Sequence, residues 1–414
     1  MVPLTTMQGF SRDEIVELTN NRDIYLWGRG GMLRDVRTSL LACGLSPVAL
    51  LDTSVNNQRG MGIPVVDPAD VIHRHWDAGK KIIIIATVSF RDQAESLCNQ
   101  YGLVKGKDYI DYLDVSRPAA IVDVSGRGEL YGSIPSRQTS GYMSLDVYRK
   151  VLKKLMHDLP LLTGIELSAG HEPLLNPEIA EIIRETEQHV PCVVATSLRE
   201  TNLLEGVILS RPSELNVIVN GIENSLKVKP EGGTCSLLEH NLKILSSLKK
   251  KFKSSTNISI KVHSFKLDTE IGKERIITLA RNLQLNLSLC RTHPAPYDEL
   301  LNYLENRQIS RAGLAALENL PWDLQKILCL CRRGIGSPCL SQRIFPIIHW
   351  DLSVSLCHVF DRPVICRNYL DVDWPNLLKM RHSAQQCELC QRHALHRLDL
   401  NVLTRRHPKE TQIG

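Results

Sequence analysis

The sequence predicts an α/β protein built from parallel sheets, and three observations lead to this class. Short apolar strands alternate with amphipathic helices along most of the 414 residues. The run KKIIIIATV at 80–88 is apolar after its two lysines, as is typical of a strand buried on both faces of a parallel sheet. Seven of the 12 cysteines follow residue 328, which marks a separate Cys-rich segment.

Composition narrows the class of protein further. The chain is 43% hydrophobic and 23% charged, as is typical of a globular protein with two or three domains. No apolar run reaches the roughly 20 residues of a membrane span, and the net charge of +5 is small. We therefore expect neither membrane nor nucleic-acid partners. Many cysteines without a basic and apolar leader favour a reducing compartment, so we expect a cytoplasmic location.

A βαβ unit is predicted in the first domain, residues 1–115. Strands at 24–27 and 48–51 flank a helix at 32–43, and a glycine turn joins the first strand to the helix. Such a turn lets the backbone approach a phosphate at the helix N-terminus, and an acid at the end of the second strand can bind a ribose. The candidate nucleotide-binding residues are Gly28, Gly30, Gly31 and Asp52.

This glycine fingerprint is incomplete, because Leu33 stands at its third position. The glycines therefore also fit a tight turn that binds no dinucleotide. With Asp52, the sequence Gly-Ile-Pro-Val at 62–65 and GKDYID at 106–111, the stretch resembles the small Rossmann-like domain found before sugar acyltransferases. This resemblance implies a nucleotide-linked sugar as ligand, or a docking role.

Strand and helix signals alternate again in the second predicted domain, residues 118–320. Helices are predicted at 144–159 and 176–188, with Ser144 and Asn176 as their N-caps. The predicted strands are 120–124, 164–168, 191–196, 214–219 and 257–265. Repeated βα units predict a parallel sheet curved into a full or partial barrel, whose sites lie at the carboxyl ends of the strands.

The order of these elements, together with the segments at their strand ends, resembles the radical SAM superfamily. VDVSGR at 122–127 matches the end of that family's first strand, and GYMSLDVYRKVLKKL at 141–155 matches the following helix. SAGHEP at 168–173 matches the Gly-Gly-Glu-Pro segment, which in the family contacts the amino group of S-adenosylmethionine (SAM). The resemblance implies a partial (βα) barrel in which Gly170 and Glu172 bind SAM.

The cluster motif of the family, Cys-x3-Cys-x2-Cys, is missing from this chain. Its three positions carry Gly128, Gly132 and Pro135, and no cysteine lies between Cys98 and Cys192. Side chains without sulfur cannot hold iron. The resemblance therefore implies a fold that has lost its catalytic [4Fe–4S] cluster and, with it, the reductive cleavage of SAM.

Two roles are open for the residues at the predicted barrel mouth. Glu172 either contributes to residual SAM binding or braces the strand ends without a ligand. His171 is expected to be a partly exposed histidine, because no titratable partner is fixed beside it in the sequence. Repurposed chemistry would use the polar residues nearby, which are Ser125, Arg127, Glu129, Tyr131 and Arg137.

Residues 325–400 resemble a SPASM-type extension and precede a tail at 401–414. The pattern is a cysteine, a hairpin at 343–357 with Asp351 near its turn, a second cysteine, a helix at 368–380 and a Cys-x2-Cys pair. The proposed ligands of a [4Fe–4S] cluster, or of zinc instead, are Cys339, Cys357, Cys387 and Cys390. Cys329, Cys331, Cys366 and His393 are then spare, and the opposing interpretation is a set of reduced buried thiols.

These features predict a radical SAM-like protein without the catalytic cluster that binds a substrate or serves as a scaffold for a catalytic partner. A small molecule, a peptide or a nucleotide-linked sugar fits as the substrate. One alternative is an enzyme with non-radical chemistry, a transferase or lyase acting on a nucleotide-linked or SAM-like substrate. The other is an electron-transfer protein that uses only the C-terminal cluster.

Overall fold

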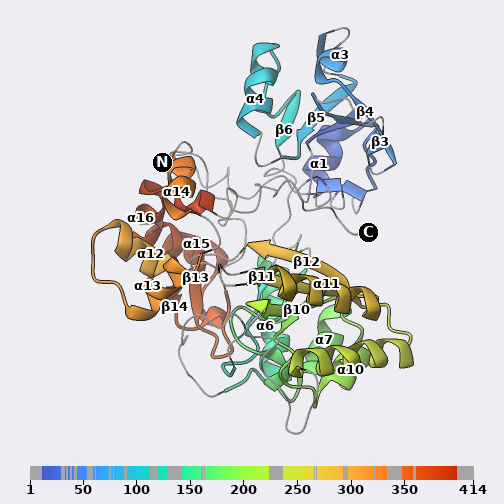
Figure 1. Cartoon of the computed structure of the whole chain (residues 1–414). Coiled ribbons are helices and arrows are strands. Elements are labelled where there is room, and N and C mark those ends of the chain that lie inside the picture. The colour runs from blue at the N-terminus through green and yellow to red at the C-terminus, as the bar shows by residue number, and fades with distance from the viewer. Residues whose placement is uncertain are drawn as a thin grey trace. The chain divides into compact units, whose positions relative to one another are not determined.

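The computed structural model consists of two compact units, residues 1–117 and 118–414, and each contains a six-stranded sheet (Figure 1). No helix among the described residues is long and apolar enough to cross a bilayer. The structure describes residues 12–28, 33, 36–37, 40–41, 44–53, 59–60, 62–73, 76–77, 79–87, 91–111, 120–128, 130, 141–159, 162, 164–222, 236–264, 266, 268–291, 297–320, 323–332, 347–357 and 360–398.

The first unit has the strand order β3-β4-β2-β1-β5-β6, parallel except for the β3–β4 pair. Its strands are β1 Asp23–Trp27, β2 Ala49–Leu51, β3 Arg59–Gly60, β4 Ile63–Val66, β5 Lys81–Ile85 and β6 Tyr109–Asp111. The helices whose bounds lie among its described residues are α1 Arg12–Thr19, α3 Pro68–His73 and α4 Arg91–Gln100. In the helix predicted at 32–43, the described residues Leu33, Val36, Arg37, Leu40 and Leu41 are helical. The strands predicted at 24–27 and 48–51 are confirmed. Strand order reverses between β1 and β5, the place where parallel sheets of this kind bind ligands.

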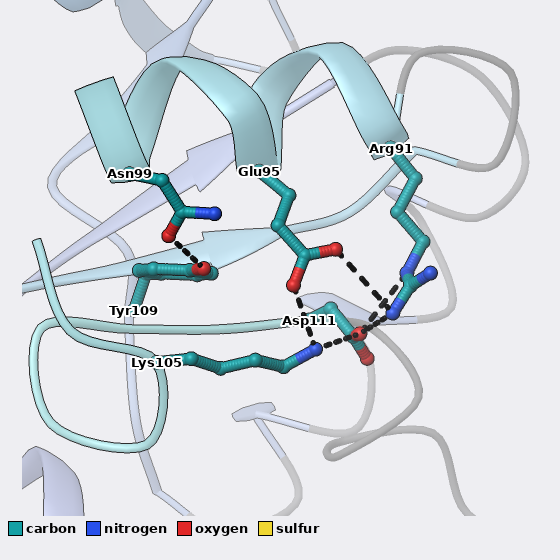
Figure 2. Close-up of polar contacts among 6 residues, drawn as sticks. All are labelled: Arg91, Glu95, Asn99, Lys105, Tyr109 and Asp111. Atoms are coloured by element: carbon teal, nitrogen blue, oxygen red, sulfur yellow. Dashed lines mark hydrogen bonds and ion pairs between the residues drawn. The ribbon is translucent and has the colours of Figure 1, made fainter.

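Charged side chains fix β6 to α4. The Asp111 carboxylate, whose side chain is 3% exposed, accepts hydrogen bonds from Arg91 Nη2 at 2.5 Å and from Lys105 Nζ at 3.1 Å (Figure 2). Glu95, one turn along α4, forms ion pairs with the same two cations. Burial by itself raises the pKa of Asp111, but the charges of Arg91 and Lys105 outweigh it and hold that pKa below its ordinary value.

Replacing Asp111 with Asn tests this charge cluster. D111N leaves two partly buried cations without their carboxylate and should lower the free energy of unfolding by about 3 kcal/mol at neutral pH. Because the folded state depresses the pKa of Asp111, wild type should also lose stability as the pH falls below the ordinary value of 3.8. Urea unfolding of the full chain measures both effects. E95Q, which alters a 26% exposed carboxylate, should cost less than about 1 kcal/mol; an equal loss in both variants contradicts this account.

The second unit contains a parallel sheet in the order β12-β11-β10-β9-β8-β7, so each strand lies beside its neighbour in the sequence. Its strands are β7 Ala120–Ile121, β8 Ile165–Glu166, β9 Cys192–Thr196, β10 Glu214–Asn220, β11 Asn257–Ser264 and β12 Asn286–Arg291. Its helices up to residue 332 are α6 Leu145–Asp158, η2 Pro173–Leu175, α7 Ile179–Glu187, α8 Leu204–Ser210, α10 Leu237–Lys251, α11 Glu270–Leu283, α12 Tyr297–Leu304, α13 Arg311–Glu318 and α14 Leu324–Arg332. The predicted parallel sheet is confirmed, with β7 and β8 shorter than expected.

Polar side chains tie the helices to the strand ends. Ser144 caps α6, as predicted. Asn176 accepts a hydrogen bond from Glu178 N at 2.9 Å, but α7 starts only at Ile179 because η2 precedes it. The fully buried Asn176 amide also donates to two carbonyls, those of Val124 and Met143, each at 2.9 Å. This side chain therefore joins the end of β7 to the start of α6.

The two faces of the sheet differ in character. One face packs on the helices, and its buried residues on β10 and β11 are Leu215, Val217, Val219, Ile258, Ile260 and Val262. The residues between them point to the opposite face, and the register places Asn216 beside Ser259 and Ile218 beside Lys261. The helix-covered face is thus apolar, whereas the other face carries polar side chains.

The C-terminal segment extends this sheet beyond β7. Ile348 forms a parallel bridge with Val122 and an antiparallel bridge with Val354, and Asp351 accepts from Ser353 N in the predicted turn. The later elements are β13 Val354–Cys357, β14 Phe360–Cys366, η4 Tyr369–Asp371, α15 Trp374–His382, α16 Gln385–Arg392 and η5 Leu395–Arg397. The single helix expected at 368–380 is wrong, because Asp373 caps a new helix whose first turn holds a proline. Buried residues of this segment, among them Val354 and Tyr369, belong to the same core as the sheet.

Candidate functional site

The loop after β7 crosses the carboxyl ends of the neighbouring strands. Leu130, which is 1% exposed, donates its N–H to Gly170 O at 2.8 Å and accepts from Asn220 Nδ2 at 2.8 Å. Its side chain packs in a small buried cluster with Ala195 of β9 and Ile218 of β10. The segment that would carry cluster cysteines in the radical SAM superfamily is thus bonded to the sheet at this point.

Gly128 occupies the position predicted for the first missing cysteine, and it has no room for a side chain. Its φ is +68°, in the left-handed region that favours glycine. A Cβ here would lie 2.9 Å from Glu172 Cβ and 3.0 Å from Leu175 Cδ1. Gly132 and Pro135 lie outside the described residues.

Glu172 is committed to bonds within the protein. Its side chain is buried, and its carboxylate accepts from Leu174 N at 3.2 Å, from Ser197 N at 2.8 Å and from Ser197 Oγ at 2.7 Å. Its backbone N–H donates to Arg127 O at 3.0 Å. These contacts favour the bracing role over SAM binding. Gly170, in contrast, has open space, since no described atom lies within 4 Å of a Cβ placed there.

A pair of alanine substitutions tests this difference between the two glycines. G128A places a Cβ against Glu172 in the left-handed region, so it should lower the free energy of unfolding by about 1–3 kcal/mol. G170A meets open space and should change it by less than about 0.5 kcal/mol. Urea unfolding compares them. A neutral G128A would show that the loop adjusts and that a side chain at position 128 is tolerated.

A buried aspartate–histidine cluster lies beside this loop, and the sequence analysis missed it. His171 Nδ1 lies 2.5 Å from Asp123 Oδ2, and His349 Nδ1 lies 3.6 Å from the same oxygen. His349 Nε2 in turn lies 2.6 Å from Ser355 Oγ. The expectation of a partly exposed His171 without a titratable partner is wrong: the residue is 8% exposed, and its partner comes from the neighbouring strand end. An acid within the apolar segment AIVDV was the available sign.

The two histidines of this cluster lower the pKa of Asp123. Burial by itself raises the pKa of Asp123, but the hydrogen bond with His171 and the proximity of His349 hold it below its ordinary value. The Asp123 carboxylate is therefore charged at neutral pH. A carboxylate that orients a histidine in this way suits proton transfer. Two histidines and a carboxylate are also iron-ligand types, but among the described residues no three such groups are arranged to hold a metal.

The predicted metal cysteines are only partly brought together. Cys357 of β13 and Cys390 of α16 belong to one buried cluster with leucines of α12 and α14, and Cys387 precedes Cys390 by one helical turn. Cys331, which the resemblance left spare, belongs to the same cluster. Cys339 lies outside the described residues, and the described ones contain no group of three metal ligands. Of the other spare residues, Cys366 donates to Asn368 O, His393 pairs with Glu305 and Cys329 is exposed.

In the first unit, close packing against the end of β5 explains why position 28 is a glycine. Its φ is +143°, and a Cβ there would lie 2.6 Å from Ala86 O and 2.8 Å from Thr87 Cβ. The close approach of these strand ends favours the tight-turn interpretation. Asp52 is half-buried at the end of β2, and Gly30 and Gly31 lie outside the described residues. Nucleotide binding by these four residues stays a prediction.

No family model matches the sequence, and neither does any curated protein. Among the solved structures that are similar to the chain are three complexes with a small molecule or a peptide. They are BtrN in complex with AdoMet and 2-DOIA (11% identity, TM-score 0.38, 72% of this chain and 95% of that one), native anSMEcpe with bound AdoMet and Cp18Cys peptide (14%, 0.40, 67% and 87%), and Streptococcus suis SuiB bound to precursor peptide SuiA (8%, 0.41, 73% and 74%).

Proposed function

We propose that this protein is a radical SAM-like protein that has lost reductive SAM cleavage and binds a substrate, or presents it to a catalytic partner. The observation that carries the proposal is the packing of Gly128 against Glu172. A cluster cysteine at this position would need both a different backbone conformation and space that the Glu172 side chain occupies. The loss of the cluster is thus accompanied by a loop geometry that excludes the first ligand.

The carboxyl ends of the same strands keep features of a binding site. Open space lies beside Gly170. Of the polar residues expected near it, Ser125 and Arg127 are described and bonded to each other, whereas Glu129, Tyr131 and Arg137 lie outside the described residues. Because Glu172 is bonded to Ser197 and no iron would chelate the methionine group, we expect any SAM binding to be weak. A small molecule, a peptide or a nucleotide-linked sugar remains the proposed substrate, with a second protein supplying the chemistry.

Anaerobic reduction in the presence of SAM tests the loss of radical chemistry. Wild type should form no 5′-deoxyadenosine under dithionite, because nothing delivers an electron to the sulfonium. The triple variant G128C/G132C/P135C should also form none and should gain no iron, since any side chain at position 128 would collide with Glu172. Formation of 5′-deoxyadenosine by wild type refutes the proposal, and a working triple variant refutes the packing argument.

For the C-terminal residues 325–400 we propose a metal site with Cys339, Cys357, Cys387 and Cys390 as its ligands. Thiolates are the donors that both iron–sulfur clusters and zinc prefer, and two of these cysteines share one buried cluster. The site would stabilise the packing of α16 on β13, or transfer electrons if it holds iron and sulfide.

Metal and sulfide contents after anaerobic purification test this site. C357S and C390S should each lose most of the bound metal, whereas C366S, whose thiol bonds to Asn368 O, should keep it. Zinc without sulfide would exclude the electron-transfer alternative. Equal metal contents in all three variants, or none in wild type, would contradict the assignment.

A repurposed non-radical enzyme is the second candidate, and the Asp123–His171 pair favours it. The pair lies after β7 and β8, at the edge of the sheet where barrel enzymes place their catalytic groups. Such an enzyme would use His171 to move a proton on a bound substrate. Turnover by the isolated protein that disappears in H171Q would favour this candidate over the scaffold role.

A further inference from the structure

The two six-stranded sheets have four edge strands, and three of them are short or covered. β3 and β7 contain two residues each, and β6 contains three. A bridge between Ile348 and Val122 covers the edge at β7, and Lys105 bridges the first residue of β6. Short strands, covering segments and charged residues prevent the backbone groups of a sheet edge from pairing with another chain.

β12 is the exception among these edge strands (Figure 1). It spans Asn286–Arg291, and all six of its residues pair with β11 without a register shift. No strand or bridge among the described residues pairs with its other side, and Asn286 and Ser288 are exposed. β12 therefore presents a regular edge to which another strand can add its backbone hydrogen bonds.

The sequence of β12 fits a second copy of itself. NLSLCR has its only charge at Arg291 and contains neither proline nor lysine, the residues that commonly protect an edge. In an antiparallel pair, residues opposite each other share a face, so a two-fold axis between two copies passes through a residue. An axis through the exposed Ser288 places that small side chain opposite its own copy and the two Arg291 residues at opposite ends. The strand pair therefore brings no like charges together, and the uncharged edge gives no electrostatic preference for a different partner.

We propose that two copies of this chain pair antiparallel through β12 and so join the sheets of their second units across a two-fold axis. The same strand of each copy forms the contact, so the assembly closes after two copies. Because a single pair of strands buries little surface, we expect a dimer that dissociates on dilution. The proposal goes beyond the substrate-binding role and does not depend on it.

Charge substitutions at Ser288 test this interface in the full chain. In sedimentation velocity, the mass of wild type should rise with concentration toward twice that of one chain. S288K and S288E should each keep the mass of one chain, because the axis would place like charges directly opposite each other. The control S247K makes the same change at an exposed position of α10 and should form the dimer as wild type does.

Mixing the two charged variants shows whether Ser288 lies opposite its own copy. An equal mixture of S288K and S288E should again reach twice the mass of one chain, because opposite charges then meet across the axis. Recovery of the dimer also shows that both variants fold. Three results would overturn the proposal: wild type with the mass of one chain at every concentration, a dimer that S288K leaves intact, or a mixture that stays monomeric. Each of them leaves the assay for 5′-deoxyadenosine unaffected.

Discussion

The contacts of Glu172 hold together the carboxyl ends of three neighbouring strands. Its backbone N–H binds the loop after β7, its own position follows β8, and its carboxylate binds Ser197 after β9. The close packing of Gly128 depends on this side chain, because the Cβ of Glu172 fills the space that a residue at position 128 would need. The segment that aligns with a ligand-binding motif therefore acts here as a structural brace.

The same brace positions the aspartate–histidine cluster. His171 directly precedes Glu172, so fixing Glu172 also fixes the imidazole against Asp123. The C-terminal segment completes the cluster, since its bridge to Val122 brings His349 within 3.6 Å of the same carboxylate. A charged carboxylate that is 1% exposed is tolerated because these imidazoles surround it. The C-terminal segment is thus joined to the sheet by the Ile348 bridge, by the contact of His349 with Asp123 and by its share of the apolar core.

We propose that the protein has lost radical chemistry but keeps two features, at Gly170 and at Asn216, that are typical of binding sites. The packing at Gly128 opposes the radical chemistry that the motifs at the strand ends suggest. Among the described residues, no atom lies within 4 Å of a Cβ placed at Gly170, and the buried Asn216 Oδ1 accepts no hydrogen bond. Polar features that cost stability are typical of binding sites. These features support the proposal that the protein binds a substrate rather than being purely structural.

The sequence by itself determined the parallel sheet, most of its strands, the Ser144 cap and the absence of sulfur at positions 128, 132 and 135, because periodicity, capping and ligand chemistry are local properties. Only the tertiary structure decided which groups meet. Asp123 and His349 are far apart in the chain, and a bridge at the sheet edge joins them. The hydrogen bonds of Glu172 with Ser197 likewise follow from strand register, which pairs residues that no short stretch of sequence relates.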